Sequence, residues 1–118
     1  MDLQLQDKVF IVTGGGAGIG GAISLTLAEE GAIPVIFGRS ALKEDLQAAL
    51  SERTSDFAFY QVDVTDEAAV ASAIAATAER FGRIDGVVNN AGANDNVGLD
   101  ASVDAFRASL ETNLIHYF

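Results

Sequence analysis

The chain has 118 residues, enough for about one small domain, and 49% of them are apolar, which excludes a disordered protein. Its net charge of −10, from 17 acidic and 7 basic residues, disfavours nucleic acid and anionic membranes as partners, because both would be repelled. The chain contains no cysteine, no signal-peptide pattern and no run of about 20 apolar residues, so we expect a cytoplasmic protein without disulfides or thiolate metal sites.

Short apolar runs alternate with helical patterns along the whole chain. Runs that are apolar at nearly every position are typical of strands buried on both faces. The predicted strands span residues 8–13, 33–38, 57–62 and 84–89. The predicted helices span residues 18–30, 41–52 and 66–81, and a fourth begins near Ser102 and is still helical where the sequence stops.

The predicted helix ends have the residue types that such ends favour. Ser40 is a candidate N-cap for the second helix, and Asp66 and Glu67 fall in the first turn of the third. Gly31 and Gly82 follow the first and third helices, where a left-handed cap is common. The regular alternation of strand and helix therefore has consistent boundaries.

Repeated strand–helix–strand units place strands parallel and helices on both faces. Right-handed crossovers then predict an α/β, Rossmann-type doubly wound sheet in the order 3-2-1-4, of which this chain supplies the first half only. In that order the fourth strand is an exposed edge. We expect the 118 residues alone to be poorly soluble or molten, because an unpaired apolar edge promotes aggregation.

Residues 13–20 form a glycine-rich turn between the first strand and the first helix. The free N–H groups and the positive dipole end of such a helix stabilise an anion without a basic side chain. Gly16-x-Gly18-x-x-Gly21 matches the general dinucleotide pattern only loosely, and the turn itself starts at Gly14. The turn predicts a nucleotide-phosphate site.

Four motifs in order extend this interpretation to the whole chain. They are Thr13-Gly14-x-x-x-Gly18-Ile19-Gly20, Asp63-Val64, Asn89-Asn90-Ala91-Gly92 and Asn113-Leu114. At this spacing they resemble the short-chain dehydrogenase/reductase family. The resemblance implies an NAD(P)-dependent oxidoreductase that transfers hydride between a hydroxyl-bearing carbon and nicotinamide. It also implies a small alcohol or sugar as substrate and a homodimer or homotetramer as the full-length assembly.

The resemblance implies a role for each motif residue. Those of the turn would line the pyrophosphate: Gly14, Gly18, Ile19 and Gly20. Asp63 would bind the adenine amino group, with the backbone of Val64 beside it, although an Asp at a strand end can instead cap the next helix. Near the cofactor ribose would lie Asn90, Ala91 and Gly92, while Asn89 would tie strands together.

The choice of cofactor depends on the end of the second strand, where an Asp or Glu would bind the 2′-hydroxyl of NAD. The sequence has Gly38-Arg39-Ser40 there and no carboxylate. Arg39 and Ser40 can bind a 2′-phosphate by charge-assisted hydrogen bonds, which favours NADP. Arg39 could also stack on adenine, which would serve NAD equally well.

Only part of the family's catalytic centre is present. Asn113 matches the position whose backbone carbonyl holds a water in the proton relay, unless it is simply a surface residue. Neither Tyr60 nor Tyr117 is followed by Lys four residues later, so neither matches the family's Tyr-x-x-x-Lys pair. His116 has no partner at metal-ligand spacing, and we expect no metal.

Residues 1–118 are therefore interpreted as an NAD(P)-binding domain truncated before the catalytic Ser and Tyr-x-x-x-Lys, and inactive alone. The alternatives are a non-catalytic dinucleotide-binding module and a nonfunctional truncated product. A finer resemblance, over residues 32–35, 89–100 and 109–117, is to family members that oxidise aldoses such as L-fucose. It suggests Asn94 and Asp95 as partners of sugar hydroxyls, although the same loop would also form Asx turns.

Overall fold

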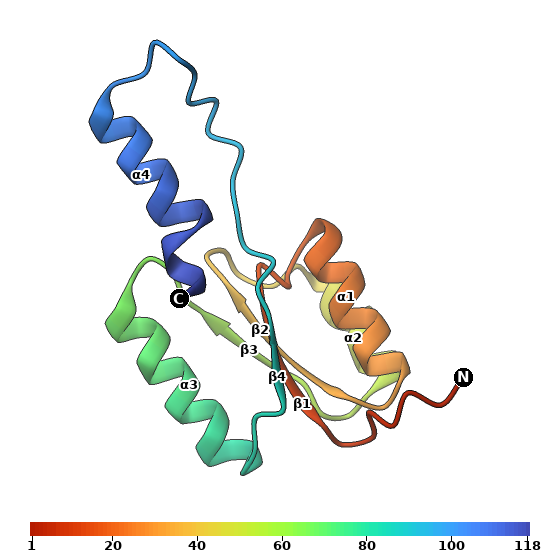
Figure 1. The fold of residues 1–118 in the computed structure, drawn as a ribbon. Helices are drawn as coiled ribbons and strands as arrows, with labels where there is room; N and C mark the ends of the chain where they lie inside the picture. The colour runs from red at the N-terminus through yellow and green to blue at the C-terminus, as the bar shows by residue number, and fades with distance from the viewer.

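Four parallel strands form the centre of the structure, a computed structural model that describes residues 1–118 (Figure 1). The strands are β1 (Val9–Thr13), β2 (Ile33–Gly38), β3 (Ala58–Gln61) and β4 (Gly86–Val88). Their order in the sheet is β3-β2-β1-β4, and every pairing is parallel. The predicted Rossmann-type fold and its strand order are confirmed.

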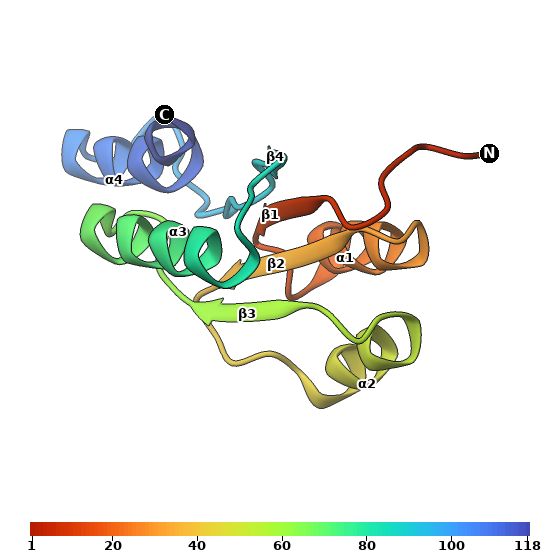
Figure 2. The ribbon, with the colours of Figure 1, turned by 90° about the horizontal axis from the view of Figure 1, so that it is seen from below.

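The helices lie on both faces of this sheet. They are α1 (Gly18–Glu29), α2 (Glu44–Arg53), α3 (Glu67–Phe81) and α4 (Val103–Asn113), followed by a short 3₁₀ helix, η1 (Ile115–Tyr117). Figure 2 shows α1 and α2 on one face and α3 on the other. No helix is both long enough and apolar enough to cross a membrane.

The core is divided by the sheet into two clusters, as the alternation of side chains along a strand requires. Val9, Ile11, Val35 and Phe37 point towards α3 and pack with its Ala73. On the other face, the α1–α2 cluster consists of Ala28, Ile36 and Leu50, with Leu42 packed against it. Because β1 and β2 are covered on both faces, their near-continuous apolar sequence is explained.

The second helix begins later than the sequence predicts. Ser40 does not cap it: α2 begins at Glu44, its N-cap is Lys43, and no side chain makes a capping hydrogen bond. The residues just before it are not helical, and Leu42 among them packs against the α1–α2 cluster. Packing of Leu42 therefore outweighs the local preference of Ser40 for a cap.

The caps of the later helices are made by side chains. Asp66 is the N-cap of α3, outside the first turn where it was predicted, and its carboxylate accepts a hydrogen bond from Ala69 N at 3.1 Å. Ser102 caps α4 by accepting from Ala105 N at 3.1 Å. The prediction that the last helix continues to the end of the sequence is wrong. The α-helix stops at Asn113, and η1 follows because its side chains bind the loop after β4, as described below.

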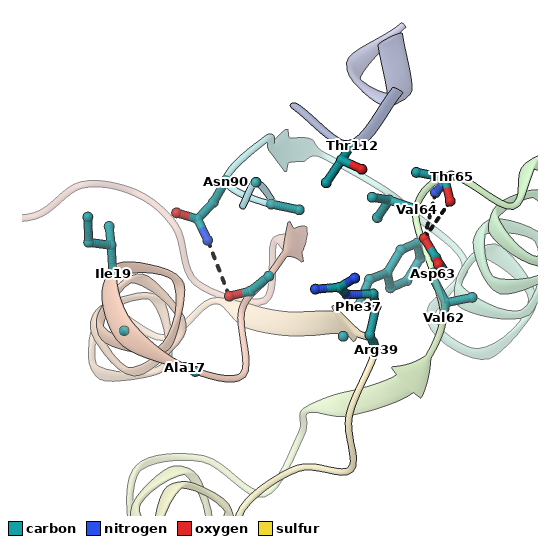
Figure 3. Close-up of a pocket in the computed structure, with 15 residues that line it drawn as sticks. Ala17, Ile19, Phe37, Arg39, Val62, Asp63, Val64, Thr65, Asn90 and Thr112 are labelled. Carbon is teal, nitrogen blue, oxygen red and sulfur yellow. Dashed lines mark hydrogen bonds between the residues drawn. The ribbon is translucent and has the colours of Figure 1, made fainter. Parts of the chain in front are cut away.

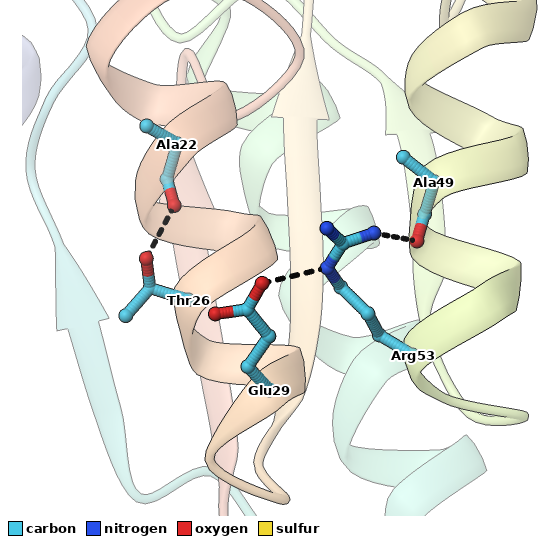
Figure 4. Close-up of polar contacts among 5 residues, drawn as sticks. All are labelled: Ala22, Thr26, Glu29, Ala49 and Arg53. Atoms are coloured by element: carbon cyan, nitrogen blue, oxygen red, sulfur yellow. Dashed lines mark hydrogen bonds and ion pairs between the residues drawn. The ribbon is translucent and has the colours of Figure 1, made fainter.

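An ion pair joins α1 to α2 at the sheet edge away from the strands' carboxyl ends (Figure 4). Arg53 donates from Nε to Glu29 Oε1 at 2.8 Å and from Nη1 to the carbonyl of Ala49 at 2.7 Å. Both side chains are partly exposed, so the pair contributes at most about 1 kcal/mol to stability. It lies at the carboxyl ends of the two helices, at the opposite end of α1 from the glycine turn.

Strand β4 is shorter than predicted and forms one edge of the sheet. It pairs only with β1, from Phe10↔Gly86 to Val12↔Val88. The ladder stops after Val88 because the backbone N–H of Asn90 donates to the Thr13 hydroxyl and to the carbonyl of Val88, both at 3.1 Å, and not to the backbone of β1. Val87 is left 54% exposed on this edge.

Candidate functional site

A pocket of about 440 Å³ lies beyond the carboxyl ends of the strands (Figure 3). This edge of an open parallel sheet is where such folds bind ligands. The glycine turn, the ends of β2 and β3, the loop after β4 and one residue of α4 all contribute to it. Its lining residues are Gly14, Ala17, Gly18, Ile19, Phe37, Gly38, Arg39, Val62, Asp63, Val64, Thr65, Asn90, Ala91, Gly92 and Thr112.

The glycine turn offers unpaired N–H groups to this pocket. No side chain caps α1, so the N–H groups of its first turn have no partner from a capping residue. Gly14 and Gly18 have φ of +66° and +54°, a left-handed conformation that other residues adopt at a cost. Gly14 N donates to the carbonyl of Phe37 at 2.8 Å, which fixes the turn beside the end of β2.

Gly20 does not line the pocket, although the sequence places it in the phosphate motif. A Cβ at this position would overlap the carbonyl oxygen of Gly14 and the side-chain nitrogen of Asn90. The residue therefore allows helix α1 to pack directly under the turn. Its contribution to the site is close packing, and the lining itself comes from Gly14, Gly18 and Ile19.

Thr13 and Asn90 fasten the glycine turn to the loop after β4. The hydroxyl of Thr13 accepts from the backbone N–H groups of Asn90 and Ala91, both at 3.1 Å, and donates to the carbonyl of Val88 at 3.3 Å. The Asn90 side chain donates to the carbonyls of Thr13 at 3.1 Å and Gly14 at 3.2 Å. The two loops that form this wall are therefore one hydrogen-bonded unit.

This network corrects the expected division of roles between the two asparagines. Asn89 was expected to tie the strands together, but its side chain makes no hydrogen bond, and it is Asn90 that bridges to β1. Only Asn90 can do so, because successive residues of an extended segment point to opposite sides. Asn90 thus both lines the pocket and holds its wall.

Arg39 and Asp63 face the pocket from the ends of neighbouring strands. Figure 3 shows the Arg39 guanidinium directed into the pocket. The Asp63 carboxylate accepts from Thr65 N at 3.0 Å and from Thr65 Oγ1 at 2.7 Å. These bonds, and then the charge of Arg39, hold the pKa of Asp63 below its usual value against the opposing effect of burial. Asp63 is therefore a carboxylate at neutral pH.

The structure distinguishes the alternative roles that the sequence offered for Asp63 and Ser40. Asp63 does not cap the next helix, because Asp66 does that. Ser40 does not line the pocket, and its side chain is exposed, whereas Arg39 does line it. Of the two residues predicted to select the cofactor, the structure brings only Arg39 to the site.

Asn113 joins α4 to the loop after β4, just outside the lining. Its side-chain oxygen accepts from Ala93 N at 2.7 Å, and its amide donates to the carbonyl of Ser109 at 3.1 Å. Asn113 is thus a bridging residue, not an isolated surface residue. Its neighbour Thr112 lines the pocket itself.

The candidate substrate residues lie away from this pocket. Asn94 and Asp95 are exposed, and neither belongs to the lining. The side-chain oxygen of Asn94 accepts from Asn96 N at 3.3 Å, which is an Asx turn. The structure thus contains the turn that the sequence offered as an alternative.

The sequence did not predict six of the lining residues: Ala17, Phe37, Gly38, Val62, Thr65 and Thr112. Phe37 ends an apolar strand, so its pattern indicates core and not a site. Thr65 follows the Asp63-Val64 motif directly, and Asp-x-Thr is a common side-chain turn, which is a signal that would have found it. Thr112 has no such signal, because only the tertiary placement of α4 brings it to the pocket.

The family model described as short chain dehydrogenase matches residues 8–118. L-fucose dehydrogenase of Bos taurus is 38% identical over 117 residues, which cover 98% of this chain and 42% of that enzyme. The NADP-dependent (R)-specific alcohol dehydrogenase of Lentilactobacillus kefiri is 40% identical over 94% of this chain and 44% of that enzyme. Levodione reductase of Leifsonia aquatica is 45% identical over 75% of this chain and 34% of that enzyme.

Solved structures of dehydrogenases are also similar to this chain. The Cj0485 dehydrogenase superposes with a TM-score of 0.95 at 39% identity, over 99% of this chain and 45% of that one. An NAD⁺-bound xylitol dehydrogenase superposes with a TM-score of 0.85 at 33% identity, over 96% of this chain and 45% of that one. In each of these comparisons the chain spans less than half the length of its relative.

Proposed function

The chain belongs to the short-chain dehydrogenase family, and we propose on that premise that it forms the NAD(P)-binding part of an oxidoreductase. The observation that carries the proposal is the pocket itself. It combines unpaired N–H groups at the start of α1 with a guanidinium and a carboxylate at the ends of β2 and β3. These are the groups that a dinucleotide needs at its pyrophosphate, ribose and base.

The residues present fit such a cofactor. The left-handed Gly14 and Gly18 leave the turn open to a pyrophosphate, which the dipole of α1 would stabilise. Asp63 has one carboxylate oxygen bound to Thr65 and the other free to accept from an adenine amino group. Val64, beside it, supplies an apolar wall for the base.

We propose that NADP is preferred over NAD. No carboxylate follows β2, so the pocket has no acceptor for a free ribose 2′-hydroxyl at that point, while Arg39 supplies a guanidinium for a 2′-phosphate. Relatives of both kinds exist, one named for NADP and one solved with NAD⁺. The Arg39 side chain is the feature of this chain that favours the phosphate.

When bound, the nicotinamide cofactor supplies the hydride chemistry, and the protein supplies binding and orientation. The proposed substrate is a small alcohol or sugar, and the specific candidate is an aldose such as L-fucose, because two L-fucose dehydrogenases are among the relatives. Asn94 and Asp95 remain the proposed partners of sugar hydroxyls, and Asn113 the proposed catalytic residue of this part. Any contact of Asn94 or Asp95 with substrate would require the loop 93–99 to approach the pocket.

Residues 1–118 alone are proposed to be inactive, because neither tyrosine in them begins a Tyr-x-x-x-Lys pair. We place them as the first part of a longer cytoplasmic enzyme that is a homodimer or homotetramer, since the relatives are more than twice as long. The alternatives are a module that binds a dinucleotide without catalysis and a truncated product without function.

The test is to titrate the product of the complete reading frame with NADPH and with NADH, following the fluorescence of the reduced nicotinamide. Binding of either supports the site, and tighter binding of NADPH supports the preference. A panel of aldoses and simple alcohols with the oxidised cofactors then tests the reaction. Absence of binding would reject the proposal, whereas binding without turnover of any substrate would favour the non-catalytic module.

A further inference from the structure

The carbonyl oxygen of Ala91 accepts two side-chain hydrogen bonds from η1. His116 Nε2 lies 3.1 Å from this oxygen and the Tyr117 hydroxyl lies 3.2 Å from it. Because a carbonyl oxygen only accepts, the His116 ring carries a proton on Nε2. Its Nδ1 is buried without a partner, which favours the tautomer with a bare Nδ1, since an N–H there would be buried without an acceptor.

The two donors form one unit. The rings of His116 and Tyr117 meet edge to face, with centroids 4.4 Å apart and planes at 86°. This contact limits the rotation of both side chains. The α-helix ends at Asn113 and the tighter 3₁₀ turn follows, so the two consecutive residues reach the same oxygen.

Fixing this carbonyl also fixes the N–H group of Gly92. The two belong to one planar trans peptide, in which C=O and N–H point in opposite directions. With its oxygen held by His116 and Tyr117, the Ala91–Gly92 peptide directs the Gly92 N–H away from η1. That N–H donates no hydrogen bond within the chain, and Gly92 lines the pocket.

The peptide before it is held in the same way. Ala91 N donates to the Thr13 hydroxyl, so the carbonyl of Asn90 points away from Thr13, and it accepts no hydrogen bond within the chain. Both polar groups of Ala91 are therefore bound inside the protein. The flanking acceptor on Asn90 and donor on Gly92 are left free.

Without the two hydrogen bonds to the Ala91 carbonyl, the Ala91–Gly92 peptide would have no fixed orientation, because Gly92 restricts it little. Glycine adopts positive and negative φ with similar ease, so an Ala–Gly peptide can rotate by half a turn at little cost. The rotated form would present a carbonyl oxygen where the N–H now lies. It would repel an oxygen of a ligand instead of binding it.

We propose that His116 and Tyr117 are positioning residues, which hold the Ala91–Gly92 peptide with its N–H available to an oxygen of the bound dinucleotide. The inference rests on the proposed function, because it assumes that a dinucleotide occupies the pocket. Neither side chain needs to touch the cofactor. Their effect is transmitted through one peptide plane.

The experiment measures NADPH affinity for the product of the complete reading frame and for four variants of it. His116→Leu and Tyr117→Phe each remove one donor, and each should weaken binding about 3- to 10-fold, as loss of one net hydrogen bond does. The combined variant should lose more than either. His116→Gln places an amide N–H near the position of Nε2 and should restore most of the affinity lost in His116→Leu.

Two further measurements separate positioning from a general loss of structure. Tyr60→Phe removes a hydroxyl outside the pocket and should leave the affinity for NADPH unchanged. ¹⁵N spectra of the His116 ring should show the Nε2–H tautomer. Unchanged affinity in the combined variant, with the fold intact by circular dichroism, would overturn the proposal, as would a failure of His116→Gln to rescue. If the unmodified protein binds neither NADPH nor NADH, the proposed function fails instead.

Discussion

Thr13 and Asn90 are joined by two hydrogen bonds, one from the backbone of Asn90 and one from its side chain. The backbone N–H of Asn90 donates to the Thr13 hydroxyl and its side-chain amide donates to the Thr13 carbonyl, both at 3.1 Å. They are 77 residues apart in the sequence, yet this pair connects β1, the glycine turn and the loop after β4. The wall of the pocket therefore depends on the hydroxyl of Thr13, a residue that is not part of the pocket lining.

Replacing Thr13 by Val should therefore affect both stability and binding. The change leaves the Ala91 N–H without its acceptor and the Asn90 N–H with the Val88 carbonyl alone, and we expect a loss of about 1–3 kcal/mol in the free energy of unfolding. Weaker NADPH binding should accompany it. Thr13→Ser keeps the hydroxyl and should recover most of both quantities. Urea unfolding and cofactor titration of the two variants check this, and equal behaviour of Val and Ser would contradict it.

Gly20 and Gly21 provide a matched pair within α1. A Cβ at Gly20 would overlap the Gly14 carbonyl, whereas a Cβ at Gly21 would make only ordinary contacts of 3.7 Å or more. Gly20→Ala should destabilise the protein by about 1–3 kcal/mol and abolish dinucleotide binding. Gly21→Ala should be neutral or stabilising by up to about 1 kcal/mol, because alanine favours the helix. Retention of binding in Gly20→Ala would show that the turn can move.

Arg39→Ala tests the proposed preference for NADP. Loss of a charge-assisted contact to the 2′-phosphate should weaken NADPH binding about tenfold or more and leave NADH nearly unchanged. Arg80→Ala removes the same charge from α3, where Arg80 lies over the ring of Phe81, and serves as the control. If NADH binding fell as much as NADPH binding, Arg39 would be stacking on the adenine instead.

Acid should weaken the junction between β4 and β1. The Asp85 carboxylate accepts from Arg83 Nε and Nη2, both at 2.7 Å, and from Val9 N at 2.8 Å. These contacts lower the pKa of Asp85, and the hydrogen bonds from Arg83 have the largest effect. A lowered carboxyl pKa gives stability that is fully present above the unfolded value, about 3.9, and is lost as pH falls through the folded value.

Asp85→Asn should therefore lower stability at pH 7 and reduce the loss on acidification below pH about 4. Urea unfolding at several pH values measures both. Asp100→Asn, which removes a carboxylate that accepts no hydrogen bond, should keep the pH dependence of the parent protein. If the free energy of unfolding changed with pH in the same way in the parent protein and in Asp85→Asn, Asp85 would not be a source of the acid sensitivity.

The sequence predicted the sheet well because strand type follows from short apolar runs and parallel order follows from the crossover rule. The predicted bounds of β2 agree with the structure at both ends, whereas β4 has three residues and the prediction gave it six. The carboxyl end of β4 depends on the hydrogen bond from the Asn90 N–H to Thr13, a contact that cannot be deduced from sequence spacing. Likewise, the start of α2 is set by the packing of Leu42, which overrides Ser40.

For the site, residues tied to backbone conformation were the predictable ones. Gly14 and Gly18 have a left-handed φ, and Asp63 follows a strand at the expected edge. Residues that act through side-chain partners far along the chain were assigned incorrectly or missed. Asn89 was given the role of Asn90, and Thr112 reaches the pocket only through the placement of α4.

The glycine turn presents N–H groups in a chain whose net charge is −10. Dipoles act over a few ångströms, while the excess of carboxylates acts over about a Debye length, about 10 Å in 0.1 M salt. An anionic ligand is thus repelled during its approach and attracted only on arrival. Added salt should screen the first effect more than the second, so the association rate should not fall with ionic strength, in contrast to proteins that capture polyanions with lysine-rich surfaces.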